Sequence, residues 1–254
     1  MARISKPPRI GAIFLSPPAL RRAKDVAMKM FSALAVKEVV ESAFKAFTQE
    51  NGETAETFFG PVGAVVEKIN GGESADLAIL IPPALEKLKG TVTGRFDLGK
   101  VGIWVTIRPG LKQPDLSSTE SFKQMLLDAK SLSLTDPGVG GTAGIYLANL
   151  LEKMGIADTI RSKVQWQKNG FVTAQAVLAG DADLGMTQKS EIVAMKGAIL
   201  AGPLPEAIQS VTTYSAGVFA TSKQQDTARA FIDRLLSPAL HEKWRAAGFE
   251  LPGA

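Results

Sequence analysis

The amino-acid sequence predicts an α/β protein with a mostly parallel sheet flanked by helices, in one large domain or two smaller ones. Apolar runs that are typical of strands alternate with segments of helical periodicity, and this alternation favours a parallel sheet. The all-apolar run at 77–81 is typical of a strand buried on both faces. Two long strands, at 100–107 and 211–221, lie far apart in the chain and are predicted to cross between domains.

The first part of the chain shows this alternation clearly. A strand that ends near Ser32 is followed by a helix from Val36, whose apolar residues recur at helical spacing until Gly52. The segment 60–63 ends an extended run and begins a second helix, which leads to the buried strand at 77–81. The helix that begins there exposes backbone N–H groups without intrahelical partners, and such an end accepts an anion.

The region between the two long strands repeats the pattern. It begins with a helix marked by the capping-box spacing Ser117-x-x-Glu120. Two closing helices, TARAFIDRLLS and PALHEKWRAAG, follow the second long strand. The remaining predicted elements are strands at 132–135, 164–167 and 182–187 and helices at 142–154 and 172–179.

The composition excludes several classes of protein. With 254 residues, of which 45% are apolar and 21% charged, the chain can bury a substantial core. Zero cysteines exclude disulfides, thiolate catalysis and cysteine-based zinc sites, and a single histidine leaves little material for a Ser-His-Asp site. No apolar run approaches the roughly 20 residues that span a bilayer, so we expect no membrane insertion. Nothing in the sequence requires a cofactor or a metal.

The basic charge is concentrated at the N-terminus. Residues 1–27 hold six basic residues and one acidic residue, a net charge of +5, which leaves −1 for the rest of a chain whose total is +4. No basic stripe with interleaved aromatics remains, so we expect no nucleic-acid partner. The segment 1–27 is expected to be a disordered arm, unless translation begins at Met28. Its prolines and short apolar run make a poor secretory signal, and this favours the cytoplasm if the sequence as written is complete.

Polar residues gather at the predicted strand ends, where ligands bind in open α/β sheets. Lys37, Lys189 and Glu191 are expected on solvated faces, and Tyr214 is expected to pack at the second crossover. Ser32 and Thr142 suit either local capping or ligand contact. The full set is Ser32, Lys37, Thr142, Asn169, Thr187, Gln188, Lys189, Glu191 and Tyr214.

The order of these motifs resembles the type II periplasmic solute-binding proteins, in their molybdate-binding-protein-like branch, over nearly all of residues 28–250. The resemblance rests on FSALAVKE, FFGPVGAVVEKINGGESADLAIL, LTDPGVGGTAGIYLANLLEKMGI, GFVTAQAVLAGDADLGMTQKSEI and TSKQQDTARAFIDRLLSPALHEKW. It implies two lobes, each built on a mostly parallel sheet flanked by helices, which close by a hinge on a small anion. One lobe comprises 28–104 and 214–254, and the other comprises 105–213. It also implies a periplasmic location and an ABC permease as partner. We expect a monomer.

The resemblance also implies ligand contacts, and the chain departs from the family there. Molybdate binders of this branch usually carry hydroxyls at the first two loops and a tyrosine at the last position. This chain has Ala35, Pro61-Val62 and Gln188 instead. An unmet oxygen of a buried dianion costs about 1 to 3 kcal/mol, and proline lacks even a backbone donor, so an organic carboxylate is expected rather than molybdate. The expected ligand-binding residues are Ser32, Ala33, Gly60, Pro61, Val62, Gly63, Gly141, Thr142, Ala143, Asn169, Gly170, Thr187 and Gln188.

Two further functions remain open from the sequence. Aconitate isomerases are similar to this branch, and their allylic proton shift needs a base. The candidates for that base are Lys37, Lys189 and Glu191, which the sequence does not rank. The other alternative is the molybdate- or tungstate-binding component of an ABC transporter.

Overall fold

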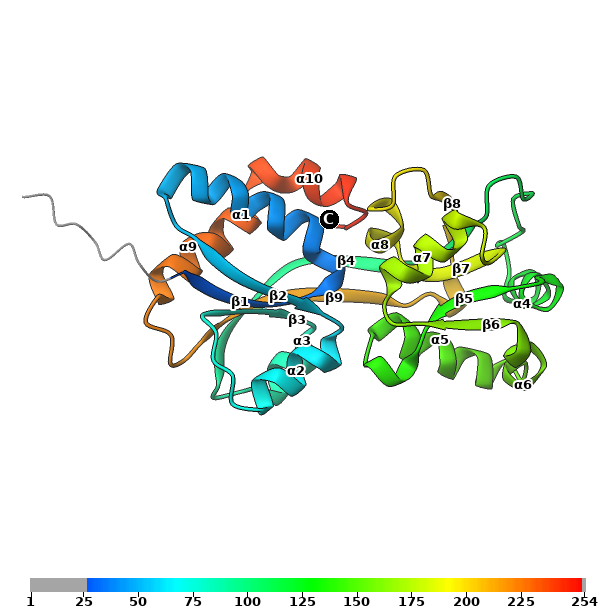
Figure 1. Ribbon diagram of the computed structural model, residues 1–254, viewed down its shortest axis with the longest axis horizontal. Helices are drawn as coiled ribbons and strands as arrows, with labels where there is room; N and C mark the ends of the chain where they lie inside the picture. Colours follow the sequence, from blue (N-terminus) through cyan, green and yellow to red (C-terminus); the bar gives the residue numbers. More distant parts are fainter. Residues whose placement is uncertain (1–26, 253–254) are drawn as a thin grey trace, which may run out of the picture.

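The computed structural model describes residues 27–252, so the expectations for the N-terminal arm concern residues outside the described part of the chain. Two lobes lie side by side, connected by the long strands β4 (Val92–Ile107) and β9 (Val211–Phe219) (Figure 1). The strands lie in the order β2 (Ala55–Gly60), β1 (Met28–Ala33), β3 (Leu77–Leu80), β9, β4, β7 (Leu184–Gln188), β5 (Leu132–Thr135) and β6 (Val164–Gln167), and β8 (Ile199–Pro203) pairs with β4. This architecture confirms the predicted two-lobed α/β fold with two crossover strands.

Lobe I carries both ends of the described chain. Its strands β2, β1 and β3 pair in parallel, and β9 joins β3 in antiparallel orientation. Helices α1, α9 and α10 cover one face of the sheet, and α2 and α3 cover the other (Figure 1). The elements are β1 (Met28–Ala33), the 3₁₀ turn η1 (Leu34–Val36), α1 (Lys37–Asn51), β2 (Ala55–Gly60), α2 (Val62–Asn70), β3 (Leu77–Leu80), α3 (Pro82–Lys87), α9 (Gln225–Leu236) and α10 (His241–Ala246).

Lobe II is formed by the middle of the chain. Its strands β6, β5 and β7 pair in parallel, and β4 joins β7 in antiparallel orientation. The parallel pairs bring the carboxyl ends of β5, β6 and β7 to one edge, which faces lobe I. The elements are α4 (Thr119–Asp128), β5 (Leu132–Thr135), α5 (Thr142–Lys153), α6 (Ala157–Ile160), β6 (Val164–Gln167), α7 (Gly170–Ala179), β7 (Leu184–Gln188), α8 (Lys189–Val193) and β8 (Ile199–Pro203).

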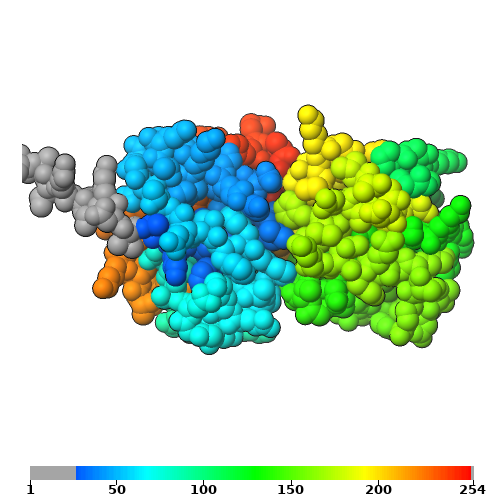
Figure 2. Space-filling model, in the orientation of Figure 1, coloured from blue at the N-terminus to red at the C-terminus, as the bar shows by residue number. Residues whose placement is uncertain are grey.

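Each lobe has its own hydrophobic core. The core of lobe I contains Leu98 and Val101 of β4 and resumes at Tyr214 of β9. The core of lobe II runs from Ile103 to Ile208. On β4 and on β9, the chain passes from one core to the other near a predicted lobe boundary. The exact boundary residues remain a prediction. The two lobes meet along a seam across the middle of the molecule (Figure 2).

The capping box of α4 differs from the predicted one. Ser118, rather than Ser117, is the N-cap, and its side chain accepts a hydrogen bond from the backbone N–H of Ser121. The backbone N–H of Ser118 in turn donates to the hydroxyl of Ser121. Asp115 accepts from the backbone N–H of Ser117, so a turn ahead of the helix moves the start by one residue.

None of the helices between residues 27 and 252 has both the length and the apolar character that crossing a membrane requires.

Candidate functional site

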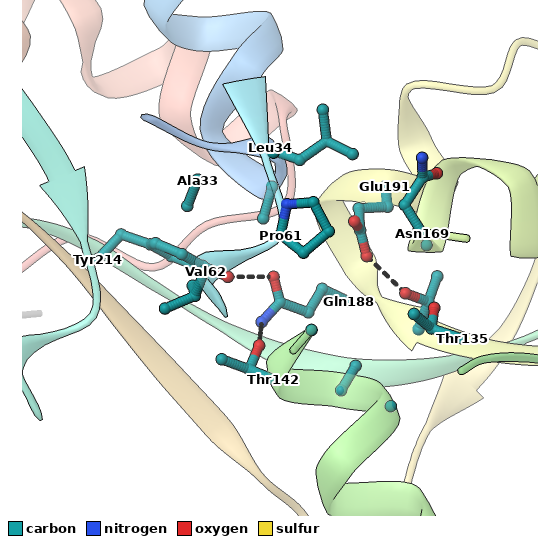
Figure 3. Close-up of a pocket in the computed structure, with 17 residues that line it drawn as sticks. Ala33, Leu34, Pro61, Val62, Thr135, Thr142, Asn169, Gln188, Glu191 and Tyr214 are labelled. Carbon is teal, nitrogen blue, oxygen red and sulfur yellow. Dashed lines mark hydrogen bonds between the residues drawn. The ribbon is translucent and has the colours of Figure 1, made fainter. Parts of the chain in front are cut away.

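A pocket lies between the lobes, at the carboxyl ends of strands from both (Figure 3). Its volume is about 30 Å³. Most of the residues expected to bind ligand line this pocket, and they do so from five different junctions. They are Ala33, Gly60, Pro61, Val62, Gly141, Thr142, Ala143, Asn169, Gly170, Thr187 and Gln188, together with the candidate base Glu191.

Four of the sequence candidates do not line the pocket. Ser32 is fully buried, and its hydroxyl donates to the carbonyl of Ala33. Gly63 lies at the contact between the lobes. Lys37 Nζ lies 3.7 Å from Glu41, and Lys189 Nζ lies 4.4 Å from the centre of the Trp104 ring. Neither lysine therefore reaches the pocket as a base.

Other residues line the pocket that sequence reasoning left out or placed elsewhere. Thr135 is the last residue of β5, and Gly144 lies in the first turn of α5. Leu34 and Ala35 contribute from η1. The strand-end rule that selected Thr187 would also have found Thr135, because both threonines end or nearly end a parallel strand. In the sequence analysis, only the resemblance to the solute-binding proteins had indicated Ala35.

Tyr214 packs at the second crossover as expected, in the core of lobe I and against Phe249, and it also lines the pocket. It is 2% exposed, and its hydroxyl donates to Oε1 of Gln188 over 2.8 Å. Nε2 of Gln188 then donates to the hydroxyl oxygen of Thr142 over 2.9 Å. Burial and the nearby Glu191 raise the pKa of Tyr214, so it remains a donor. Since Thr142 accepts in this chain, its own proton is free for a ligand (Figure 3).

Glu191 is the only charged residue among the described residues that line the pocket. It is 7% exposed and not on a solvated face, contrary to expectation. Its Oε2 accepts a hydrogen bond from the Thr187 hydroxyl over 2.5 Å. Burial raises the pKa of this carboxyl to about 7, although Thr187 and the backbone N–H groups of Gln188 and Gly170 act in the opposite direction.

Three helices begin at the pocket without a side-chain cap, namely α2, α5 and α8, whose N-cap is Gln188. Gly141 precedes α5 and Pro61 precedes α2, and neither offers a side-chain acceptor to the first turn. The first N–H groups of a helix have no intrahelical partner, so those of α5 are available to an anion. The start of α7 differs, because the Asn169 side chain accepts from the N–H of Val172. No cluster of three or more metal-ligating side chains occurs within residues 27–252.

The two walls of the pocket differ in chemistry. Lobe I presents alanine, leucine, proline and valine side chains from η1 and from the start of α2, with Tyr214 as its polar exception. Lobe II presents threonines, Asn169, Gln188, Glu191 and the uncapped start of α5. The site therefore suits a ligand with one polar end and one apolar side.

The lobes touch above the pocket through two glycines. The N–H of Gly63 donates to the carbonyl of Gly140 over 3.2 Å. A Cβ atom at Gly140 would lie 2.8 Å from the Cα of Gly63, and Gly140 has a φ of +74°. Only glycine permits both this backbone conformation and this approach.

We expect Gly140→Ala to weaken ligand binding about tenfold, because the added methyl group opposes the closed arrangement. The matched control is Gly155→Ala, whose φ is +67° and whose Cβ would meet nothing within 4 Å. Both variants should lose about 1 kcal/mol of stability from backbone strain, but only the first should lose affinity. Calorimetric titration measures this, and equal affinities in the two variants would contradict it.

The two-lobed fold and the pocket between the lobes are those of a binding protein for small solutes. The chain belongs to the bacterial extracellular solute-binding protein family, whose model matches residues 28–250. This family membership confirms the resemblance that the motif order indicated.

Two curated relatives match over most of their length. An aconitate isomerase from Pseudomonas sp is 28% identical, over 90% of this chain and 89% of the relative. The molybdate-binding protein ModA of Escherichia coli is 24% identical, over 87% and 88%. Among solved structures, the periplasmic molybdate-binding protein of Azotobacter vinelandii has a TM-score of 0.73 at 18% identity, over 89% of this chain and 99% of that one. This last likeness shows the fold.

Proposed function

We propose that this protein binds a small organic carboxylate between its lobes, in preference to molybdate or another tetrahedral oxyanion. The observation that carries the proposal is the division of the pocket into an apolar wall and a polar wall. A carboxylate group would lie against the uncapped start of α5 and the free proton of Thr142. The hydrocarbon part would lie against Pro61, Val62 and Leu34.

The hydroxyl inventory argues against a tetrahedral dianion. Thr187 donates to Glu191, and Thr173 donates to the carbonyl of Asn169 while it pairs with Thr135. Tyr214 donates to Gln188. Among the hydroxyls of the described pocket, Thr142 alone keeps a proton for a ligand. Four oxygens of a desolvated dianion would need more donors, and each unmet oxygen costs about 1 to 3 kcal/mol.

The size of the pocket limits the ligand. A volume of about 30 Å³ holds about two water-sized groups, which is the scale of one carboxylate group. A short carboxylate fits between the lobes as they stand. A tricarboxylate would require the lobes to separate, and rotation along the paired crossover strands β4 and β9 would allow this.

A thermal-shift panel tests the proposal. We expect short carboxylates such as formate and acetate to raise Tm by about 5 to 10 °C at about 100 times Kd, because the ligand binds only the folded state. Molybdate, tungstate and sulfate should act more weakly at equal concentration. Strong stabilisation by molybdate alone would show that the loss of the family's hydroxyls does not decide specificity.

An isomerase of a small unsaturated tricarboxylate is the second candidate function, and Glu191 is the observation that favours it. An allylic proton shift needs one base that can release its proton again, and a pKa near the working pH suits that task. Of the three candidate bases, only Glu191 lines the pocket. Incubation with trans-aconitate, followed by NMR detection of the cis isomer, tests this function. No cis isomer over long times would remove it.

Transport is the third part of the proposal. A curated relative from Bacillus subtilis bears the name of a putative ABC transporter substrate-binding lipoprotein, at 22% identity over 89% of this chain. We infer an ABC permease as the partner that would receive the ligand from the closed lobes.

A further inference from the structure

We propose that the pocket binds its anion together with one proton, which Glu191 carries. This inference rests on the proposed function, since it concerns how the same pocket accepts an anion. It starts from an apparent conflict in the site. Uncapped helix N–H groups favour an anion, yet the only charged side chain among the described residues of the pocket is a carboxylate.

The position of Glu191 makes the conflict severe. Its carboxyl group lies against the start of α7, so closely that a Cβ atom at Gly170 would be 1.9 Å from Oε2. Thr187 holds the same oxygen from β7. A carboxyl group enclosed on these sides cannot turn out to solvent when a ligand enters. A bound anion and an ionised Glu191 would repel each other strongly in a desolvated pocket, so one of the two must be protonated.

Within residues 27–252, no cation is placed to resolve the conflict in another way. Across a separate groove, Ser190 and Val193 of α8 face Glu38 of α1 and Lys243 of α10, whose Nζ is hydrogen-bonded to Ser42. The elements packed most closely against α8 are α7, β7, β8, η1 and β4. The first four carry no ionisable side chain. Tyr214 faces the pocket from β9 as a neutral donor. The remaining ionisable groups on β4 and α8 are engaged elsewhere: Arg95 pairs with Asp97, Lys100 with Glu250, and Lys189 lies over Trp104.

The proton therefore comes from solvent, and the environment of Glu191 already favours its uptake. Burial raises the pKa of this carboxyl to about 7, and an anion bound in the same pocket would raise it further. Protonated Glu191 removes the repulsion and offers the pocket a hydrogen-bond donor. Since the competent form is lost as pH rises above this pKa, the apparent affinity must fall with it.

Calorimetric titration between pH 6 and 9 tests the proposal with acetate, trans-aconitate and sulfate, which remain ionised over this range. For each probe that binds, we expect affinity to fall about tenfold per pH unit above about 7. Titrations in buffers of different ionisation enthalpy should show uptake of close to one proton per anion at pH 8.5 and close to none at pH 6. These measurements use the unmodified protein and need no variant to fold.

A variant identifies the residue that carries the proton. Glu191→Gln should bind the same probe with an affinity that is flat from pH 6 to 9 and tighter than that of the unmodified protein at pH 8.5. The matched control is Glu152→Gln, an exposed glutamate of α5, which should keep the pH dependence. An unchanged slope in Glu191→Gln would overturn the assignment to this residue.

The outcomes separate this inference from the function on which it rests. Anion binding that does not vary with pH, without proton uptake, overturns the coupling and leaves the carboxylate-binding function standing. No binding of any of the three probes overturns both. Stabilisation by ethylammonium that grows with pH would show that Glu191 is the counter-ion of a cation, and would overturn both as well.

Discussion

Gly170→Ala is expected to destabilise the protein by about 3 kcal/mol and to abolish anion binding. The added Cβ atom would lie 1.9 Å from Oε2 of Glu191 and 2.2 Å from Oγ1 of Thr187. Both atoms are buried, so neither side chain can move away without breaking the hydrogen bond between them. Urea denaturation measures the stability, and calorimetric titration measures the binding.

A second substitution shows where the Gly170→Ala penalty arises. In the double variant Gly170→Ala/Glu191→Ala the closest overlap is gone, while the contact with Thr187 remains. Adding Gly170→Ala to the Glu191→Ala variant should cost at most half of the stability that Gly170→Ala costs in the unmodified protein. The reason is that the two residues are in contact, so their effects are not additive. Additive effects would show that the penalty does not come from Glu191.

Gly144→Ala is expected to cost about 2 to 4 kcal/mol. Its Cβ atom would lie 2.5 Å from the carbonyl oxygen of Thr135, which is backbone and cannot rotate away. Alanine's better helix propensity, about 1 kcal/mol, offsets only part of this. Helix α5 would have to move off the end of β5, and Thr142 would move away from Gln188 with it, so affinity should fall too.

The control for Gly144→Ala lies three residues earlier. At Gly141 a Cβ atom would meet only a methyl carbon of Thr135, at 3.4 Å, so Gly141→Ala should cost less than about 1 kcal/mol. Urea denaturation of the two variants compares them directly. Similar midpoints would mean that α5 does not need its close approach to β5.

The fold was predictable because its signals are local. Helical periodicity, the Gly52 stop and the apolar run at 77–81 each indicated one element, and their alternation indicated parallel strands. The strand-end rule then indicated Thr142, Asn169, Thr187 and Gln188 without knowledge of their contacts, and the family resemblance indicated the segments at 60–62 and 141–143. The prediction for α4 missed its N-cap by one residue, since the turn at Asp115 depends on side-chain hydrogen bonds that periodicity does not report.

The residues that were misplaced or only partly placed depend on tertiary contacts. Helix α8 has five residues, too few to show which side is buried, so Glu191 resembled a solvated residue. Tyr214 reaches the pocket because β9 pairs with β4 in a register that the sequence does not reveal. Lys37 and Lys189 follow strand ends as expected, but their long side chains extend to Glu41 and Trp104.

The two crossover strands also fix the order in which the lobes can be completed during synthesis. The core of lobe I includes Phe219, Phe231 and Trp244, so it stays unfinished until almost the whole chain has left the ribosome. Every residue of the lobe II core has by then been made, because that core ends at Ile208. Domains generally fold as units while the chain grows. Lobe II, which is inserted within the sequence of lobe I, can therefore fold first. Lobe I, which begins the chain, completes its core last.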